Sequence, residues 1–209
     1  MKNTLTEFIG TFFLVLTIGL TVTANSQFAP LAIGAALMIM VYAGGHVSGG
    51  HYNPAVSVAA MMRGALPSGQ LIGYIVSQVL GAAVAALVVY VITGKTFAPT
   101  PAADASTLGA LLVEVLFTFA LCLVVLNVAV AKKTQGNSFY GLAIGFTVVV
   151  AAFAGGGISG GAFNPAVGLG PTIIHATMGG GSWSAVWLYL VGPLAGGVLA
   201  ATVFGIQEG

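Results

Sequence analysis

Long apolar stretches run through the whole chain, and short segments containing glycine, proline and polar residues separate them. Six of these stretches are long enough for a helix to cross the hydrocarbon core of a bilayer, which takes about 20 residues. The pattern therefore predicts an all-α membrane protein with six transmembrane helices and no separate soluble domain. The expected spans are residues 5–25, 29–46, 69–92, 108–131, 139–155 and 183–206.

Two further apolar stretches, residues 54–62 and 165–178, are too short to span a membrane. Each offers roughly 10 helical residues, or about 15 Å at 1.5 Å per residue, which is half of a bilayer. Each follows an asparagine and begins with a proline, and these residue types suit the N-cap and the first position of a helix. We therefore expect two re-entrant half-helices in addition to the six spans.

The segments that lead into the half-helices repeat one another. The sequence Ser-Gly-Gly, one further residue, an aromatic residue and then Asn-Pro-Ala-Val occurs twice, and its asparagines, Asn53 and Asn164, are 111 positions apart (164 − 53). Glu7 and Glu114 also correspond, 107 positions apart (114 − 7). Three spans per half is an odd number, so the halves must insert in opposite orientations. We predict one domain, residues 1–209, formed by an inverted repeat with halves 1–94 and 108–209. Such a repeat places a site near the bilayer midplane.

Composition leads to the same class of protein. Hydrophobic residues make up 58% of the chain and charged residues only 4%, whereas about a quarter of a soluble domain is charged. The chain is therefore expected to be an integral, multi-pass membrane protein that uses the lipid bilayer as its solvent. A net charge of +1 provides no basic patch for a nucleic acid, and the single cysteine, Cys122, excludes an internal disulfide.

The basic residues predict the orientation of the spans. Because cytoplasmic loops carry an excess of lysine and arginine, we expect the N- and C-termini to be cytoplasmic, in a plasma (inner) membrane. The first span is longer than the apolar region of a signal peptide and contains Glu7, so we expect it to be retained. Only Lys95 then lies outside, and four basic residues lie inside: Lys2, Arg63, Lys132 and Lys133.

The repeated segments have the chemistry of a pore. Non-helical backbone is tolerated at membrane depth only where it is buried in protein or lines a water-filled cavity, so the glycine-rich runs 44–50 and 155–161 are pore candidates. Their free carbonyls would accept hydrogen bonds, and the asparagine amides would donate them. Two half-helix N-termini that face one midpoint, each with about half a positive charge, would exclude cations and protons but let neutral dipoles pass. We predict a passive channel for water and small neutral solutes, with no cofactor and no metal. The expected pore residues are the motifs Asn53, Pro54, Ala55, Asn164, Pro165 and Ala166 and the loop backbone at Gly49, Gly50, His51, Gly160 and Ala162.

The two Asn-Pro-Ala motifs, the Ser48-Gly-Gly-His51 lead-in, and Glu7 and Glu114 early in each half resemble the aquaporin, or major intrinsic protein, family. The resemblance covers essentially the whole chain. It implies a right-handed bundle of six helices with two half-helices, one pore per subunit, and assembly as a homotetramer.

One departure from the family pattern affects selectivity. The family usually places an arginine directly after the second Asn-Pro-Ala, where it lines a narrow filter, and this chain has Val167. The position of the aspartate that usually follows in glycerol facilitators holds Gly168. The filter implied by the resemblance is therefore wide and apolar, closer to that of plant vacuolar-type members, and favours permeation by urea, ammonia, hydrogen peroxide or glycerol as well as water. The alternative is a channel mainly for these solutes, with little selectivity for water. Its four residues are Ile33, Ala152, Gly161 and Val167.

The two acids inside spans allow two interpretations. Glu7 and Glu114 are candidates for a functional role because ionisable groups are costly in a membrane. We favour a bracing role, in which each accepts hydrogen bonds from the backbone of a re-entrant loop. The alternative is a proton relay in a secondary transporter, which would require a coupled ion flux.

Two further alternatives concern catalysis and metal binding. Gly157-Ile-Ser159-Gly160 matches a nucleophile motif of intramembrane proteases, and catalysis there would need a histidine base such as His175. A metal site would have to combine His46 and His51 with His175 from the opposite half. We expect neither an enzyme nor a metal centre.

Overall fold

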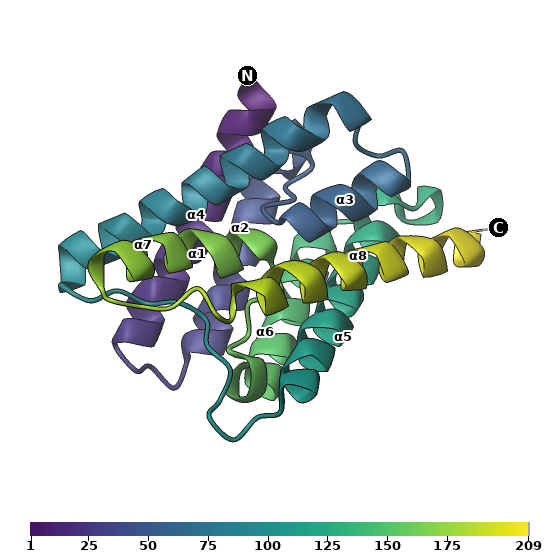
Figure 1. Ribbon diagram of the computed structural model, residues 1–209. Coiled ribbons are helices and arrows are strands. Elements are labelled where there is room, and N and C mark those ends of the chain that lie inside the picture. The colour runs from purple at the N-terminus through teal and green to yellow at the C-terminus, as the bar shows by residue number, and fades with distance from the viewer. Residues whose placement is uncertain (209) are drawn as a thin grey trace.

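A computed structural model describes residues 1–208, and most of these residues are helical. Within this described part of the chain, six helices are long and apolar enough to cross a membrane, as predicted. Two shorter helices lie between them (Figure 1). The long helices are α1 (Lys2–Thr23), α2 (Ala29–Ser48), α4 (Leu71–Thr93), α5 (Thr107–Val125), α6 (Tyr140–Ser159) and α8 (Val186–Glu208), and the short ones are α3 (Pro54–Met62) and α7 (Pro165–Met178).

Three short turns complete the secondary structure of residues 1–208. The 3-10 turn η1 (Ser68–Gln70) leads into α4, and the 3-10 turn η3 (Lys132–Thr134) follows α5. Between α5 and η3, the π-turn η2 (Leu126–Val130) ends the predicted fourth span. The sequence pattern did not predict this π-turn.

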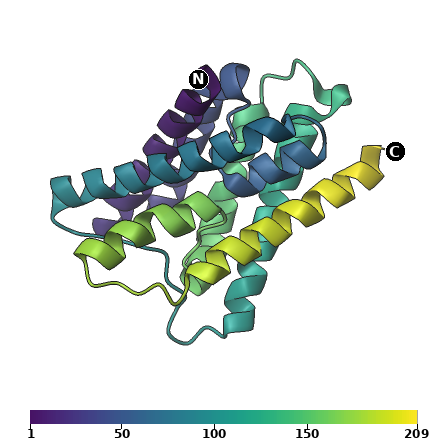
Figure 2. The ribbon, with the colours of Figure 1, turned by 45° about the horizontal axis from the view of Figure 1, so that its top comes forward.

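Corresponding helices pair in the two halves. Helix α1 packs against α4, and α5 packs against α8 (Figures 1 and 2). Both crossings depend on a glycine, because a Cβ on Gly81 would lie 2.5 Å from the Phe8 carbonyl oxygen and one on Gly196 would lie 2.4 Å from that of Val115. Small residues of this kind let helix backbones approach closely in membranes. The matched contacts support the predicted inverted repeat, which remains our interpretation.

Among the long helices of the two halves, α2 crosses α6. A Cβ on Gly34 would lie 2.5 Å from the Gly145 carbonyl oxygen, and a Cβ on Gly145 would lie 2.5 Å from that of Gly34. The crossing is thus reciprocal between two glycines that are themselves 111 positions apart (145 − 34). Neither position therefore has room for a Cβ, and α2 and α6 lie in close contact at this point.

The glycine-rich runs are less irregular than predicted. Helix α2 continues to Ser48 and α6 continues to Ser159, so most of runs 44–50 and 155–161 is helical. Between α2 and α3 the backbone is non-helical only at residues 49–53, and between α6 and α7 only at residues 160–164. The physical reason is that backbone N–H and C=O groups at membrane depth must be paired, which favours continuing a helix through glycines despite their poor helix propensity.

The half-helices begin at their asparagines, as expected. Helix α3 has 9 residues and α7 has 14, and both have the bounds predicted from the sequence. Helix α3 packs against α8, and α7 packs against α4, which means that each half-helix contacts a long helix from the other half (Figure 1). Large apolar side chains such as Ile72, Val91 and Ile206 are exposed on the outer surface, as a surface in contact with lipid requires.

Candidate functional site

The two asparagines cap the half-helices. Asn53 Oδ1 accepts a hydrogen bond from the Ala55 backbone N–H at 2.9 Å, and Asn164 Oδ1 accepts one from that of Ala166 at 2.9 Å. Both asparagines have extended backbone, as an N-cap residue does, and the proline that follows each of them occupies the first helical position. Each cap uses the oxygen of its amide and leaves the NH2 group for other partners.

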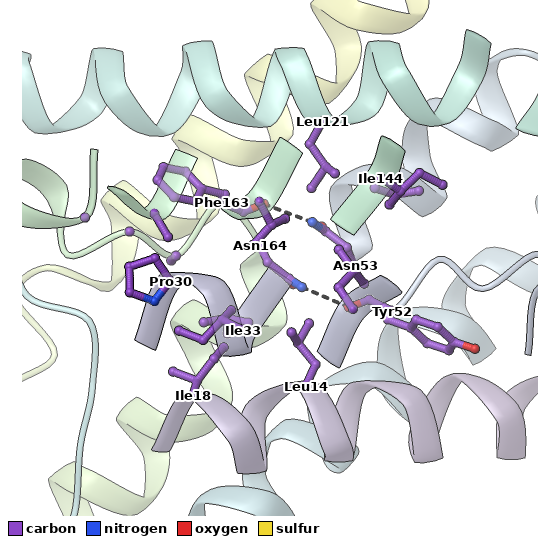
Figure 3. A pocket seen from close by; sticks show the side chains of 18 of the residues that line it. Leu14, Ile18, Pro30, Ile33, Tyr52, Asn53, Leu121, Ile144, Phe163 and Asn164 are labelled. Carbon is purple, nitrogen blue, oxygen red and sulfur yellow. Dashed lines mark hydrogen bonds between the residues drawn. The ribbon is translucent and has the colours of Figure 1, made fainter. Parts of the chain in front are cut away.

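Each asparagine also binds the loop of the opposite half. Asn53 Nδ2 donates to the Phe163 carbonyl at 2.9 Å, and Asn164 Nδ2 donates to the Tyr52 carbonyl at 2.8 Å (Figure 3). An amide NH2 has two N–H groups, so each asparagine keeps one N–H beyond this bond. The crossed bonds bring the N-termini of α3 and α7 together at the centre of the molecule.

The loops before the asparagines have unusual backbone. Tyr52 and Phe163 have φ values of 51° and 50°, in the left-handed region that few residues other than glycine adopt. Gly49, Gly50 and their counterparts Gly160 and Gly161 also have positive φ. Such conformations persist only where surrounding contacts hold them.

Two buried acids supply those contacts. Glu7 accepts hydrogen bonds from the backbone N–H of His51 at 3.0 Å and of Tyr52 at 2.6 Å. Glu114 accepts the corresponding bonds from Ala162 at 3.0 Å and Phe163 at 2.7 Å. Because every one of these partners donates, each acid acts as an acceptor. This geometry suits our interpretation of loop bracing better than a proton relay.

Serine and tyrosine side chains extend the bracing to the ends of α2 and α6. Ser48 Oγ donates to Glu7 at 2.6 Å, and Ser159 Oγ donates to Glu114 at 2.7 Å. The Tyr74 hydroxyl donates to the Ser48 carbonyl at 2.7 Å, and the Tyr189 hydroxyl donates to the Ser159 carbonyl at 2.5 Å. Sequence reasoning missed both tyrosines, because a tyrosine in an apolar span gives no local signal of its partner.

A cavity of about 290 Å³ lies between the two halves. The two asparagines and the loops form one part of its wall, and the rest is almost entirely apolar (Figure 3). All four residues of the predicted filter line this central cavity. The prolines and alanines of the two motifs do not line it and are buried in the half-helices. The apolar wall includes Leu14, Ile18, Ile33, Leu37, Leu121, Ile144 and Val148.

The loop backbones face cavities as well. Gly50, His51, Gly160 and Ala162 line the central cavity, whereas Gly49 lines a second cavity of about 320 Å³. Within residues 1–208, no hydrogen bond is made to the carbonyl oxygens of residues 49–51 or 160–162. The carbonyl oxygens left available as acceptors are therefore fewer than the full glycine runs would offer, namely three in each loop.

The second cavity adjoins the central one. Among the described residues, only His51 and Val125 line both cavities. Its other walls come from the N-terminus of α1, the segment after α3, the start of α4 and the π-turn η2, through residues such as Asn3, Leu66, Tyr74 and Ala129. The predicted filter and the asparagines line the first cavity, and His51 stands where the second cavity adjoins it.

The residues considered for catalysis and metal binding are not brought together. Ser159 is bonded to Glu114, and His175 Nδ1 lies 2.8 Å from Thr96 Oγ1, so these two residues do not form a nucleophile and base pair. His46 is exposed. No group of three or more histidine, cysteine, aspartate or glutamate side chains that could hold a metal ion occurs in residues 1–208.

Comparisons with known proteins identify the family. The family model described as major intrinsic protein matches residues 1–204. Aquaporin NIP1-1 of Zea mays is 33% identical over 216 residues, covering 99% of this chain and 74% of that protein. Glycerol uptake facilitator protein-like 6 of Lactiplantibacillus plantarum is 36% identical over 216 residues, covering 96% of this chain and 95% of that protein.

A solved structure agrees. The X-ray structure of the aquaglyceroporin from Plasmodium falciparum superposes with a TM-score of 0.87 at 25% identity, over 97% of this chain and 94% of that one. Members of the family are channels and not enzymes, which argues against the protease alternative. The chain therefore belongs to the major intrinsic protein family, and is an integral multi-pass membrane protein of the class that provides passive channels for water or small solutes.

Proposed function

We propose that this protein passes water and small neutral solutes. We further propose that it excludes ions and protons at Asn53 and Asn164, each of which binds the loop of the opposite half. The observation that carries this proposal is the pair of reciprocal bonds from Asn53 to Phe163 and from Asn164 to Tyr52, within a cavity that is otherwise mostly apolar. The remaining amide N–H groups and the positive ends of α3 and α7 converge there, and both favour an oxygen acceptor over a cation.

Proton exclusion follows from the direction of these donors. A water molecule between the asparagines accepts hydrogen bonds from both, so its own hydrogens point away from both. Neighbouring waters are then oriented in opposite directions on the two sides, and a chain along which protons could hop is interrupted. With Val167 in place of a filter arginine, this central barrier is the main one.

The predicted filter determines which solutes enter from its side. Ile33, Ala152, Gly161 and Val167 present no charge, no ring and no side-chain donor to the cavity. Such an opening imposes a smaller steric barrier than an arginine-lined one and lets solutes larger than water through, including urea, ammonia, hydrogen peroxide and glycerol. We propose a solute range wider than that of a water-selective channel.

A secondary transporter is the less favoured alternative. Coupled transport needs an ionisable group that changes partners, whereas Glu7 and Glu114 are fully buried and engaged with loop donors. We further propose a plasma-membrane location with both termini cytoplasmic, which puts the second cavity on the cytoplasmic side, and assembly as a homotetramer with one pore per subunit.

Stopped-flow light scattering on proteoliposomes tests the proposal. The purified protein is reconstituted, and shrinkage or swelling is recorded in gradients of sucrose, urea and glycerol. We expect water flux well above that of empty liposomes, a measurable urea flux, and no loss of an imposed pH gradient beyond the lipid background. Water and solute fluxes equal to those of empty liposomes would refute a passive channel, and solute uptake that requires a sodium or proton gradient would favour the transporter.

A further inference from the structure

The connection between the two halves contains an extended segment, residues 95–102, which we call the strap. It follows the end of α4 and leads toward the start of α5 (Figures 1 and 2). It has no regular secondary structure. Because the strap joins the two halves, it has no counterpart elsewhere in the repeat. Its position must therefore be explained by contacts of its own.

Three contacts anchor the strap to helices other than α4 and α5. Thr96 Oγ1 lies 2.8 Å from Nδ1 of His175 in α7. The Phe97 ring is buried against α1, where a Cβ on Gly19 would collide with it. The Ala102 N–H donates to a carbonyl near the end of α6 at 3.0 Å. The strap is therefore held at both of its ends, by helices from both halves of the chain.

Between these anchors the strap is stiff. Residues 98–101 have the sequence Ala-Pro-Thr-Pro. Each proline fixes its own φ, and the residue before a proline is restricted to extended conformations, so all four residues have little freedom. A proline-rich segment of this kind acts as a semi-rigid spacer. The anchors at Phe97 and Ala102 therefore determine where the four residues between them lie.

The strap meets the second loop (residues 160–164) at Gly160. A Cβ on Gly160 would lie 2.6 Å from the backbone nitrogen of Thr100 and 2.7 Å from its carbonyl oxygen. Gly160 and the next residue, Gly161 of the predicted filter, line the central cavity, and both have positive φ. Thr100 is not among the residues that line this cavity. Its backbone therefore supports the loop from the side away from the cavity.

The first loop (residues 49–53) is supported differently. Gly49 corresponds to Gly160 (160 − 49 = 111), and a Cβ on Gly49 would lie 2.9 Å from Nε2 of His51 in the same loop. His51 corresponds to Ala162 (162 − 51 = 111), whose methyl group is too small to fill the equivalent place. In the second loop, the backbone of the strap takes the place that a side chain of the loop itself takes in the first.

We propose that the strap positions the predicted filter, with Phe97, Pro99 and Pro101 as the positioning residues. The inference rests on the proposed channel function and leaves selectivity with the four filter residues. Gly161 has no side chain, so its backbone alone forms its part of the filter, and the strap supports the residue directly before it. Backbone of positive φ persists only where surrounding contacts hold it. A loosened strap lets the backbone at Gly160 and Gly161 move away from the cavity, which widens the filter.

Two variants loosen the strap in different ways. The double substitution Pro99→Gly with Pro101→Gly keeps every anchor and removes the stiffness. Phe97→Ala keeps the prolines and removes the anchor on α1, and Phe97→Leu is its conservative counterpart because it keeps a large apolar side chain there. The matched control is Ala103→Gly with Ala105→Gly, which adds the same number of glycines to the connection outside the strap. Proteoliposomes of each variant are measured for water, urea and glycerol flux.

We expect the double proline variant to raise the glycerol-to-water flux ratio by about fivefold, less than the factor of about 10 or more that one methylene group gives in a closed pocket, because the filter is loosened and not removed. Phe97→Ala should shift the ratio in the same direction. Phe97→Leu and the double alanine control should keep it within about twofold, as substitutions without a named structural effect do. A ratio is compared because a variant that folds less well lowers all fluxes together.

Hydrogen exchange of the loop amides provides a second measurement that does not depend on transport. The N–H groups of Ala162 and Phe163 in the second loop are hydrogen-bonded, as are those of His51 and Tyr52 in the first. We expect the double proline variant to exchange faster than the unmodified protein in the second loop and at the unmodified rate in the first. Faster exchange in both loops would indicate general destabilisation and would overturn the positioning role.

The flux measurements separate failure of the inference from failure of the channel. Ratios in the double proline variant and in Phe97→Ala equal to those of the unmodified channel would overturn the inference and leave the channel function intact. A lower glycerol-to-water ratio would also overturn it, because the freed strap would then obstruct the pore and not widen it. Absence of water and solute flux in the unmodified protein would instead refute the proposed function itself.

Discussion

Replacing Glu114 by glutamine tests whether the buried acids hold the loops. The carboxylate accepts from Ser159 Oγ at 2.7 Å, Ala162 N–H at 3.0 Å and Phe163 N–H at 2.7 Å. Glutamine has only one oxygen, so its NH2 group must face one of the two backbone N–H groups. In either orientation of the amide, the N–H of Ala162 or of Phe163 is left without an acceptor. The Ser159 hydroxyl can rotate to another partner, but a backbone N–H cannot.

The expected cost has two parts. An unsatisfied buried backbone N–H costs about 1–3 kcal/mol, and the remaining bonds lose the additional strength that a charged acceptor gives, about 1 kcal/mol. The total is roughly 2–4 kcal/mol, and at about 2–4 °C per kcal/mol for a chain of this length the midpoint of thermal unfolding falls by about 4–16 °C. Displacement of Phe163 would also weaken the bond that its carbonyl accepts from Asn53.

The assay is thermal unfolding of the detergent-purified protein, followed by water flux in proteoliposomes. Glu7→Gln should give a similar decrease in the midpoint, because Glu7 accepts the equivalent bonds from His51 and Tyr52. Glu208→Gln is the control, since Glu208 is exposed at the end of α8, and we expect its midpoint to stay within about 1 °C. Midpoints for Glu114→Gln and Glu7→Gln that match this control would refute the bracing role.

Three further changes test other parts of the structure. Val167→Arg should narrow the predicted filter and reduce urea flux more than water flux, and an unchanged urea-to-water ratio in liposomes would argue against the filter assignment. Gly34→Ala puts a Cβ 2.5 Å from the Gly145 carbonyl oxygen and should lower the midpoint of thermal unfolding by about 5 °C or more. Gly157→Ala is its control, because a Cβ there meets no atom within 4 Å and should leave the midpoint nearly unchanged. Asn164→Asp keeps the cap on Ala166 but removes the donor to Tyr52 and adds a negative charge, so we expect faster decay of an imposed pH gradient. A decay rate equal to that of the unmodified channel would show that the barrier to protons lies elsewhere.

Sequence patterns predicted the helices well because a membrane imposes strict lengths on apolar segments. All six spans and both half-helices were predicted, and the capping role of Asn53 and Asn164 follows from the proline after each. The ends of α2 and α6 were placed too early, since glycine disfavours helix in water but does not end a helix that must satisfy its backbone in lipid.

The contacts around His51 could not be predicted: its Nδ1 lies 3.0 Å from Ser57 Oγ, which accepts a hydrogen bond from Gln78 Nε2 at 2.9 Å. Ser57 and Gln78 are single polar residues in apolar segments, and local patterns do not indicate what such residues bind across a distance of 21 positions (78 − 57). A clue was present in the alignment of Gln78 with Pro193, since a buried amide that the other half lacks requires partners of its own. The hydrogen bonds from each asparagine to the loop of the opposite half could not be predicted from the sequence either, because they depend on how the halves pack.

The hydrogen bonds that the asparagines make between the two halves also determine when the pore can form during synthesis. Asn53 needs the carbonyl of Phe163, which is 110 residues further along the chain. The first half can insert its three spans without this partner, but its re-entrant loop lacks that bond until α6 and the second loop have been made. Contacts of such long range form late. Opening of a passage through the bilayer is therefore tied to completion of the chain, and a truncated product that lacks the second half cannot form one.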